Sequence, residues 1–425
     1  MARASRRYGR LARAFLSAGF LIACSHKDAP PAPASSASAS ASVAIADAGS
    51  RPHTTSPKIA YNNLNIDIAG RQQAYDKQPT AEALSRLIGS LSARQQFAGK
   101  MSDLETIDHL TIAALKDHVS DPQAHLSRAS ALSAVHKFAL ALGELSNAEH
   151  LGAPADKVKE ARASIFQATG KYDDALKIRT DHDTSLDLPA AIVSHAELAG
   201  EMQNVDESEK LFAEARAKYR DVSPFFVGWM DFQHASLLER RGERDEAKRV
   251  FAEAVQVLPS YTHAAVHLAA LETPERALEI LTPLVDTTDD ADVLAGMADA
   301  LRRTGKTADA TAMQARAKAR YDELLKKYPE AFADHAATFY LGPQGDVKLA
   351  LSLAKSNEEN RKTEPSVELL MTAALANNSH DAICLAVREG ATLKYTSPPF
   401  RANFAPLAPG CGVDAGVLAI DAGSK

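Results

Sequence analysis

The sequence predicts an all-α protein built from stacked helical hairpins, and three observations lead to this fold class. Residues 241–261, RGERDEAKRVFAEAVQVLPSY, join two helix-forming segments through a glycine. Related stretches recur along the chain with a period of roughly 34 residues. A single hairpin of this size cannot bury its apolar face, so neighbouring copies have to pack against one another.

The spacing within residues 241–261 explains the hairpin. Gly242 stands where the first helix ends, because glycine adopts a positive φ at the lowest cost. Ala247, Phe251 and Ala254 follow at i, i+4 and i+7 and share one helix face. A small, a large and a small side chain on that face let a second helix pack closely. Pro259 then ends the second helix.

Further copies carry the turn glycine with an alanine five positions later. These pairs are Gly170 and Ala175, Gly305 and Ala310, and Gly345 and Ala350. We expect repeats to start near residues 156, 189, 228, 262, 291, 331 and 363. Residues 58–120 are expected to form an N-terminal helical region of degenerate repeats, and residues 121–395 a solenoid.

This pattern resembles the tetratricopeptide repeat (TPR) family, most closely at residues 241–261. The resemblance implies a right-handed α-solenoid of about 7–8 helical hairpins, whose concave groove binds peptides or protein segments. It also places fixed positions of each first helix in the groove. The candidate groove contacts are Trp229, Phe232, Arg240, His263, Arg302, Arg303, Phe332 and Phe339. Phe225, Phe226 and Trp229 can alternatively be core residues between irregular repeats.

The N-terminus predicts export and lipidation. Residues 1–23 contain five arginines, no acidic residue and a short apolar segment, which is typical of a signal peptide. Leu21, Ile22, Ala23 and Cys24 resemble a bacterial lipobox, which implies cleavage before Cys24 and acylation of its thiol. Ser25 after the cysteine favours the outer membrane. An ordinary signal peptide, or a twin-arginine signal at Arg6 and Arg7, is the alternative.

Residues 24–57 follow as a tether. They are rich in Ala, Ser and Pro and have few large apolar groups, so they cannot bury enough surface to fold. Removing the five arginines of residues 1–23 changes the formal net charge of the chain from −6 to −11. An acidic body argues against nucleic acid as a partner. We therefore expect a body held near a membrane by acyl chains on Cys24.

Two cysteines remain after Cys24, namely Cys384 in the last repeat and Cys411 in the Pro/Gly-rich C-terminal tail, residues 396–425. In an oxidising compartment such a pair is a disulfide candidate. The bond would fasten the tail to the final repeat as a cap. Two free thiols are the alternative, and a tail that lies in the groove is a further hypothesis.

The sequence contains little that predicts catalysis. His263 and His267 lie four residues apart on one helix, but no helpfully spaced carboxylate or cysteine accompanies them. The acidic segment DTTDDAD, residues 286–292, lacks the glycine and the closing glutamate of a calcium loop, so helix capping is expected there. The sequence has no phosphate-binding glycine loop and no G-x-S-x-G segment. We expect no metal, no cofactor and no enzymatic activity.

Three classes of function remain. The favoured one is a non-enzymatic scaffold or adaptor that binds proteins in the bacterial cell envelope, because this role needs a large surface and no chemistry. The second is a peptide- or glycan-binding accessory to cell-wall enzymes. The third is an enzyme that uses histidines and carboxylates from several helices.

Overall fold

The computed structural model describes residues 52–180, 188–343 and 345–419, and these residues contain helices but no strand. The α-helices of the first half are α2 (Pro57–Lys77), α3 (Ala81–Ala98), α4 (Ser102–Asp117), α5 (Pro122–Ala134), α6 (Phe138–His150), α7 (Ala155–Ala168), α8 (Tyr172–Thr180), α9 (Pro189–Glu201), α10 (Val205–Lys218) and α11 (Pro224–Arg240). Those of the second half are α12 (Arg244–Val257), α13 (Thr262–Leu271), α14 (Pro274–Leu281), α15 (Ala291–Arg303), α16 (Thr307–Lys327), α17 (Pro329–Leu341), α18 (Val347–Asn360), α19 (Glu364–Ala376), α20 (His380–Thr392), α21 (Pro398–Phe404) and α22 (Ala415–Ala419).

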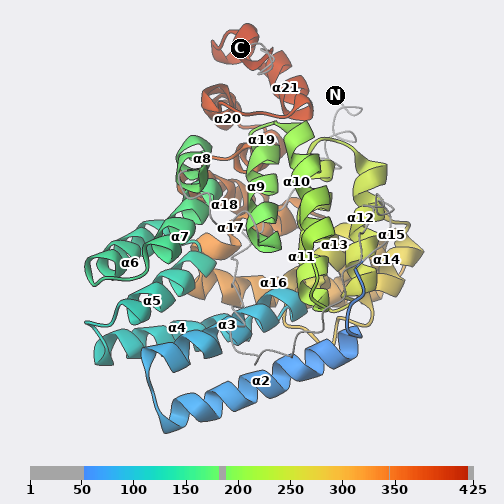
Figure 1. The fold of residues 1–425 in the computed structure, drawn as a ribbon. Coiled ribbons are helices and arrows are strands. Elements are labelled where there is room, and N and C mark those ends of the chain that lie inside the picture. Colours follow the sequence, from blue (N-terminus) through green and yellow to red (C-terminus); the bar gives the residue numbers. More distant parts are fainter. Residues whose placement is uncertain (1–51, 181–187, 344, 420–425) are drawn as a thin grey trace, which may run out of the picture.

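The helices pack as consecutive hairpins, which confirms the all-α solenoid (Figure 1). Helices α3 to α20 form nine such pairs within the described chain, more than the expected 7–8, because the N-terminal region supplies complete pairs as well. The seven helices from α7 to α19 with odd numbers begin within four residues of the repeat starts expected from the sequence. Helix α2 precedes the first pair and packs on α3.

Three turns have the backbone that the glycine spacing predicts. Gly170, Gly242 and Gly305 have φ values of +79°, +83° and +79°. Gln203 replaces glycine in the α9–α10 turn and still adopts a φ of +62°. Gly345, by contrast, lies in the α17–α18 connection without a positive φ. Its part in the repeat is steric instead, because a Cβ there would overlap the carbonyl of Tyr340.

The predicted helix face is buried as expected. Ala247, Phe251 and Ala254 of α12 are fully buried, and they pack with Leu238 of α11 and Leu268 of α13 in one apolar cluster. The corresponding alanines of the other hairpins are also buried, namely Ala175, Ala310 and Ala350. The small–large–small pattern therefore marks the contact between the two helices of a hairpin and the next repeat.

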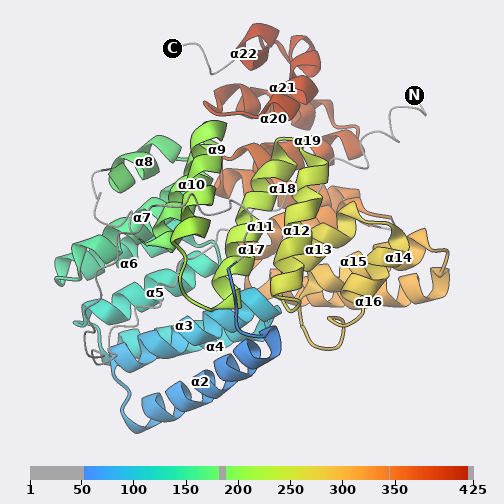
Figure 2. The same cartoon turned by 45° about the vertical axis from the view of Figure 1, so that its right-hand side comes forward.

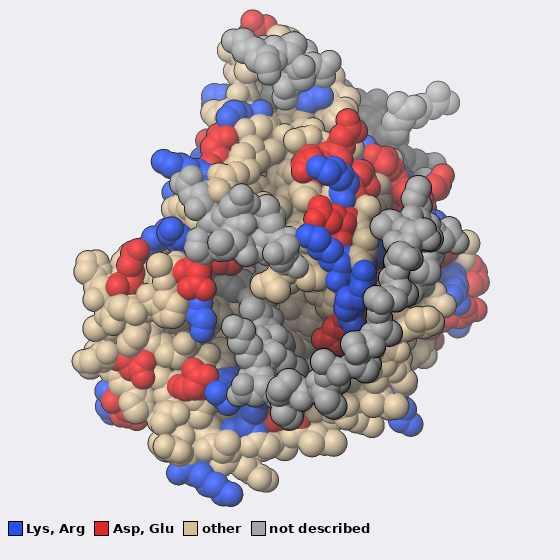
Figure 3. Space-filling view, in the orientation of Figure 1, with Lys and Arg blue, Asp and Glu red and all other residues tan. Residues whose placement is uncertain are grey.

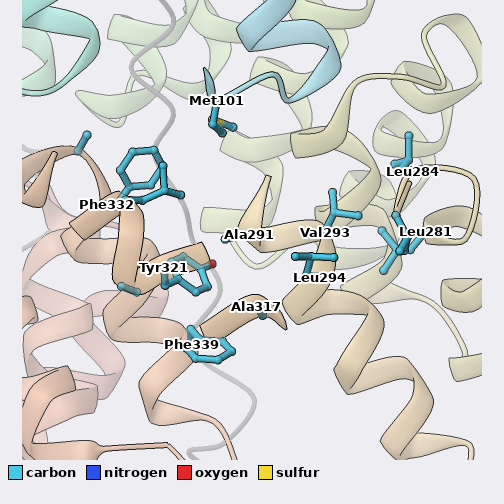
Figure 4. Packing of buried hydrophobic residues seen from close by; sticks show 14 of the residues in the cluster. Met101, Leu281, Leu284, Ala291, Val293, Leu294, Ala317, Tyr321, Phe332 and Phe339 are labelled. Carbon is cyan, nitrogen blue, oxygen red and sulfur yellow. The ribbon is translucent and has the colours of Figure 1, made fainter. Parts of the chain in front are cut away.

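The two halves of the solenoid meet, which the sequence did not predict. Met101 and Leu104, from the start of α4, belong to the same apolar cluster as residues of α13 to α18. Figure 4 shows Met101 near Ala291 and Phe332 in this cluster. The Asp289 carboxylate accepts hydrogen bonds from the backbone amides of Met101 at 2.5 Å and of Ser102 at 3.0 Å. Figure 2 shows α3 and α4 in front of the later helices from a second direction.

The C-terminal segment caps the last hairpin. Phe400 and Phe404 of α21 stack at 4.0 Å between ring centroids and pack on Val367 and Val387. Cys384 of α20 and Cys411 form a disulfide, with their Cα atoms 5.0 Å apart. The tail up to residue 417 therefore lies on the end of the solenoid as a cap. Every helix in the described ranges is too short or too polar to span a bilayer.

Candidate functional site

Charged side chains line the inside of the solenoid, on the first helices of successive hairpins. They are only slightly exposed: the side chains of Glu201, Arg240 and Asp292 are 8%, 15% and 14% exposed. They belong to helices α9, α11 and α15. Charged groups in such surroundings interact much more strongly than on an open surface, because less water separates them. The inner face thus consists of two charged clusters, which we call the glutamate cluster and the histidine cluster.

The glutamate cluster joins helices that are far apart in the sequence. Its members are Glu197 and Glu201 of α9, Arg240 of α11, and Glu364 and Glu368 of α19. Arg240 lies 3.4 Å from the Glu201 carboxylate and interacts electrostatically with the other three glutamates. Since α9 and α19 are about 160 residues apart in the chain, this single arginine connects both sides of the solenoid.

The carboxylates of this cluster are incompletely neutralised. Burial raises the pKa of Glu197 to about 8, and the charge of Glu201 adds to the effect. Burial also raises the pKa of Glu201, Glu364 and Glu368. Glu201 accepts a hydrogen bond from Gln167 at 2.7 Å. Such shifts indicate a buried group of carboxyls that hold their protons more tightly than usual, as candidate functional sites often do.

The histidine cluster is balanced by contrast. His335 Nδ1 lies 2.6 Å from the Asp292 carboxylate, and the other carboxylate oxygen of Asp292 accepts the Tyr321 hydroxyl. Burial alone would lower the pKa of His335, but Asp292 and Asp334 raise it to about 10. Arg361 stands 3.6 Å from the second carboxylate, Asp334. Two cations and two anions therefore pair inside the protein, and this cluster serves stability.

A polar cleft gives access to the glutamate cluster. It has a volume of about 260 Å³ and lies between the start of α8 and the segment that links α20 to α21. Its lining residues are Gly170, Lys171, Tyr172, Asp173, Asp174, Lys362, Glu364, Leu393, Lys394 and Tyr395. A smaller pocket of about 20 Å³ shares Tyr172, Glu364 and Tyr395 with it and reaches Glu201 and Arg240. The cleft and the pocket together are the candidate site.

The candidate groove contacts divide into two groups, and four of them are buried core residues instead of groove residues. The exposed fractions of Trp229, Phe232, Phe332 and Phe339 are 4%, 0%, 9% and 8%. The reason is close packing between hairpins: Trp229 lies among residues of α9 and α10, and Phe232 contacts the rings of Phe251 and Tyr261. These aromatic side chains are therefore not available to a partner in this conformation.

The polar candidates lie at separate places. Arg240 belongs to the glutamate cluster, whereas Arg302 donates to Gln314 and Arg303 donates to the carbonyl of Glu272. His263 borders the histidine cluster, with its ring 6.4 Å from that of His335. The structure does not bring these residues together as a basic strip. Figure 3 likewise shows acidic and basic side chains interspersed on the face it displays.

His263 and His267 also have different neighbours. His267 Nδ1 lies 2.9 Å from the Glu239 carboxylate, whereas His263 is near His335. Within the described ranges, no group of three or more His, Cys, Asp or Glu side chains is arranged to hold a metal ion. In the acidic segment 286–292, Asp290 caps α15 by accepting the amide of Asp292 at 2.9 Å. Leu21, Ile22, Ala23 and Cys24 lie outside the described residues.

Sequence reasoning missed the four glutamates. A usable signal was present, since α9 (PAAIVSHAELAGE) and α19 (EPSVELLMTAALA) are apolar first helices that each carry two glutamates four residues apart. That spacing places both carboxylates of a pair on one helix face. What the spacing does not reveal is that the two faces meet across the solenoid.

Comparisons with known proteins find only distant similarity. No family model matches the chain, and no curated protein matches it. Among solved structures, a tetratricopeptide repeat protein from Parabacteroides merdae has 15% identity and a TM-score of 0.36, covering 70% of this chain and 99% of that one. Yeast Tom70 has 13% identity and a TM-score of 0.33, covering 79% of this chain and 89% of that one.

The Cut9–Hcn1 hetero-tetramer of the APC/C is a third similar structure, at 9% identity and a TM-score of 0.30, covering 85% of this chain and 89% of that one. Identities and scores this low leave the assignment of the fold to the chain's own geometry. That geometry consists of paired helices, positive-φ turns and buried alanines at the repeat spacing. The chain is thus similar to tetratricopeptide repeat proteins in architecture.

Proposed function

We propose that this protein is a non-enzymatic scaffold that binds segments of other proteins in the bacterial cell envelope. The observation that carries the proposal is the charged inner face, to which the first helices α9, α11 and α19 contribute Glu201, Arg240 and Glu364 beside an open cleft. A solenoid surface of this kind binds a segment of a partner protein through side chains from several repeats. Charge complementarity then supplies the specificity of binding.

The envelope part of the proposal depends on the N-terminus. Leu21 to Cys24 supply the lipidation motif, and residues 24–57 supply the tether. In the structure the Thr55 amide donates to the carbonyl of Val222 at 2.7 Å, so the tether joins the solenoid beside α11. Residues 24–51 lie outside the described residues; a random-coil chain of about 30 residues would reach about 30 Å on average and so would keep the body near the membrane. We propose the periplasmic face of the outer membrane as its location.

A second candidate function is an accessory role in which the cleft binds a peptide or a glycan for cell-wall enzymes. Its specific support is the shape of the cleft, whose volume of about 260 Å³ suits one or two residues of a small ligand better than a folded partner. Tyr172 and Tyr395 flank it with their ring centroids 6.2 Å apart. Aromatic rings with a polar end are well suited to such ligands.

Site-specific crosslinking in the native host tests the scaffold. A photoreactive amino acid replaces Lys171 at the cleft in one variant and Arg276, on the outer helix α14, in the control. We expect covalent adducts with one or a few proteins from position 171 and not from position 276. Identical adducts from both positions, or adducts from neither when the protein is abundant, would count against a scaffold that uses this cleft.

A separate experiment tests the anchor. Metabolic labelling with a fatty acid should label the wild-type protein and place it in the membrane fraction. Cys24→Ser should remove both the label and the membrane association, because no other part of the predicted N-terminus is expected to hold the body at the membrane. Cys411→Ser is the matched control. A variant at Cys24 that remains labelled would show that the lipobox assignment is wrong.

A further inference from the structure

The cleft and the smaller pocket form a continuous path to the glutamate cluster. Tyr172, Glu364 and Tyr395 line both cavities, so the two volumes meet at these three residues. Glu201 and Arg240 line the inner pocket alone, whereas Lys362 and Lys394 line the outer cleft alone. A group that enters the cleft between the lysines therefore meets the carboxylates at its inner end.

At the inner end, four carboxylates face one nearby guanidinium. Glu197, Glu201, Glu364 and Glu368 all interact with Arg240, and Arg179 reaches only the two glutamates of α9. Arg179 is already engaged, since it donates to Gln167 and to the carbonyl of Ser194. With Arg179, Arg240 and Arg401 all counted, the fully ionised cluster would hold one more negative charge than positive charges, and the raised pKa values of Glu197 and Glu368 mean that protons take up this excess when no cation is bound. Buried charge of one sign is costly unless a partner neutralises it.

Two polar side chains of this region, Glu368 and Tyr172, make no side-chain hydrogen bond within the described residues. The Glu368 carboxylate accepts no hydrogen bond from any residue that the structure describes, and burial raises its pKa. The Tyr172 side chain is only 8% exposed, lines both cavities, and its hydroxyl makes no hydrogen bond within the same ranges. Buried polar groups in native proteins are nearly always paired. The Tyr172 hydroxyl can be reached from the cavity, so a ligand that enters the cleft can form a hydrogen bond with it in place of water.

The lysines at the cleft do not compete for this role, because two of them are engaged with acids. Lys394 Nζ lies 2.8 Å from the Asp173 carboxylate, and Lys362 Nζ lies 2.8 Å from that of Glu389. Lys171 is placed over the ring of Phe166 at 5.6 Å. Acids thus neutralise Lys362 and Lys394 at the entrance, whereas the carboxyl groups of the interior outnumber the arginines beside them.

We infer that the cleft binds a cationic side chain, lysine or arginine, presented by a segment of a partner protein. The ammonium or guanidinium group would lie beside Glu201 and Glu364, which line the inner pocket, and donate a hydrogen bond to the Tyr172 oxygen, while Glu368 of the same cluster would attract it electrostatically. The alkyl stem would lie in the cleft against the Tyr172 and Tyr395 rings, which contact each other edge to face with their centroids 6.2 Å apart. This inference rests on the proposed scaffold function and specifies the chemistry of its partner.

Calorimetric titration of the full-length protein in non-ionic detergent tests the inference. The probes are the blocked tripeptides acetyl-Gly-Lys-Gly-amide and acetyl-Gly-Arg-Gly-amide. The matched controls are the same lysine peptide with an acetylated side chain and acetyl-Gly-Glu-Gly-amide. We expect the lysine and arginine peptides to bind at low salt, and the acetylated peptide to bind about tenfold more weakly or not at all, because a charge-assisted hydrogen bond is lost.

Three variants of the protein complete the test. Glu368→Gln and Tyr172→Phe should each weaken the lysine peptide about three- to tenfold, whereas Glu279→Gln, on the outer helix α14, should leave its affinity unchanged. Glu368 and Tyr172 make no internal hydrogen bond, so both variants should fold, which circular dichroism checks. If either variant fails to fold, the inference is still tested by comparing the affinities of the wild-type protein for the lysine peptide and for its acetylated form.

The possible outcomes distinguish a failure of this inference from a failure of the proposed scaffold function. Binding of the glutamate peptide in place of the lysine peptide would assign the site to the entrance lysines and overturn the inference. Equal affinity of the wild type and both cleft variants would overturn it as well. Crosslinked partners without binding of any cationic probe would leave the scaffold in place and refute only the chemistry. Cationic binding without protein partners would support the cleft as a site and contradict the scaffold.

Discussion

His335 is held as a cation by two carboxylates inside the protein. Asp292 lies 2.6 Å from its Nδ1 atom, and Asp334 is 3.8 Å from its Nε2 atom. An imidazole placed this way contributes to stability only while it is protonated. The glutamate cluster differs from this arrangement, because its carboxyl groups outnumber the arginines beside them. One inner cluster therefore stabilises the fold, and the other is suited to a ligand.

The His335 pair should make stability depend on pH at the alkaline side. The folded pKa of about 10 lies above the unfolded value of about 6.5, so the contribution is complete below pH 6.5 and is lost as pH rises towards 10. His335→Gln should lower the free energy of unfolding by about 3–5 kcal/mol at pH 6. Its deficit relative to the wild type should shrink progressively between pH 6.5 and pH 10.

Urea titrations at pH 6, 8 and 10 measure this difference. His109→Gln is the matched control, because His109 is exposed on α4, and its stability should follow the wild type at each pH. A deficit of His335→Gln that stays the same at pH 6 and pH 10 would show that packing, not charge, explains the role of the residue.

At the scale of single elements, much of the fold could be predicted from the sequence. Gly170, Gly242 and Gly305 have the positive φ that their spacing predicts, since a helix–helix turn of this type requires it. Local rules are sufficient there because turn and helix face lie within one hairpin. They fail at Trp229 and Phe232, whose family positions predict the groove but whose burial depends on the packing of neighbouring hairpins. Irregular repeat lengths decide that packing, and local spacing does not contain it.

Gly170 and Gly305 both lie in helix–helix turns, but only Gly170 also packs against another part of the chain. Both have a φ of +79°, but a Cβ at Gly170 would overlap the carbonyl of Lys362, whereas a Cβ at Gly305 meets nothing within 4 Å. Gly305→Ala should lower the free energy of unfolding by about 1–2 kcal/mol, because alanine disfavours a positive φ. Gly170→Ala should lower the free energy of unfolding by at least twice as much, because the α7–α8 turn must also move away from the segment before α19.

Thermal or urea unfolding of the two alanine variants measures the difference directly. Equal losses for Gly170→Ala and Gly305→Ala would mean that the α7–α8 turn and the Lys362 carbonyl are not in contact in solution. Alanine is the smallest change that adds a Cβ, so the comparison introduces no other new group.

The disulfide should hold the C-terminal cap in place. With Cys384 and Cys411 separated by 27 positions in the sequence, the entropy model gives about 3–4 kcal/mol for closing this loop. Cys411→Ser should therefore make the segment around α21 more sensitive to limited proteolysis, while α3 to α18 stay protected. Thiol counting on the denatured wild-type protein should show two additional thiols after reduction. A count that is already complete before reduction would contradict the bond.

At the scale of the whole molecule, contacts between early and late repeats determine access to the inner face. Lys327 lies 2.8 Å from Glu105, and Asn360 donates to the carbonyl of His136 at 3.0 Å. Each contact joins residues more than 200 positions apart. No motif predicts them, because small rotations between successive hairpins accumulate along a solenoid and decide where its ends meet. The inner clusters therefore could not be predicted from the sequence either.

Asp289 tests whether these contacts close the solenoid. Its carboxylate accepts the amides of Met101 and Ser102 and also pairs with Arg320 at 3.1 Å, so it links α4 to α16. Asp289→Ala should leave two amides at the start of α4 without their acceptor and loosen the contact between the halves. Small-angle X-ray scattering should then give a larger radius of gyration than for the wild type, with unchanged helix content by circular dichroism. Asp286→Ala, an exposed neighbour, should match the wild type. If Asp289→Ala keeps the wild-type radius, the apolar cluster around Met101 and Phe332 is sufficient to hold the halves together, and access to the inner face depends on the cleft beside Tyr172 alone.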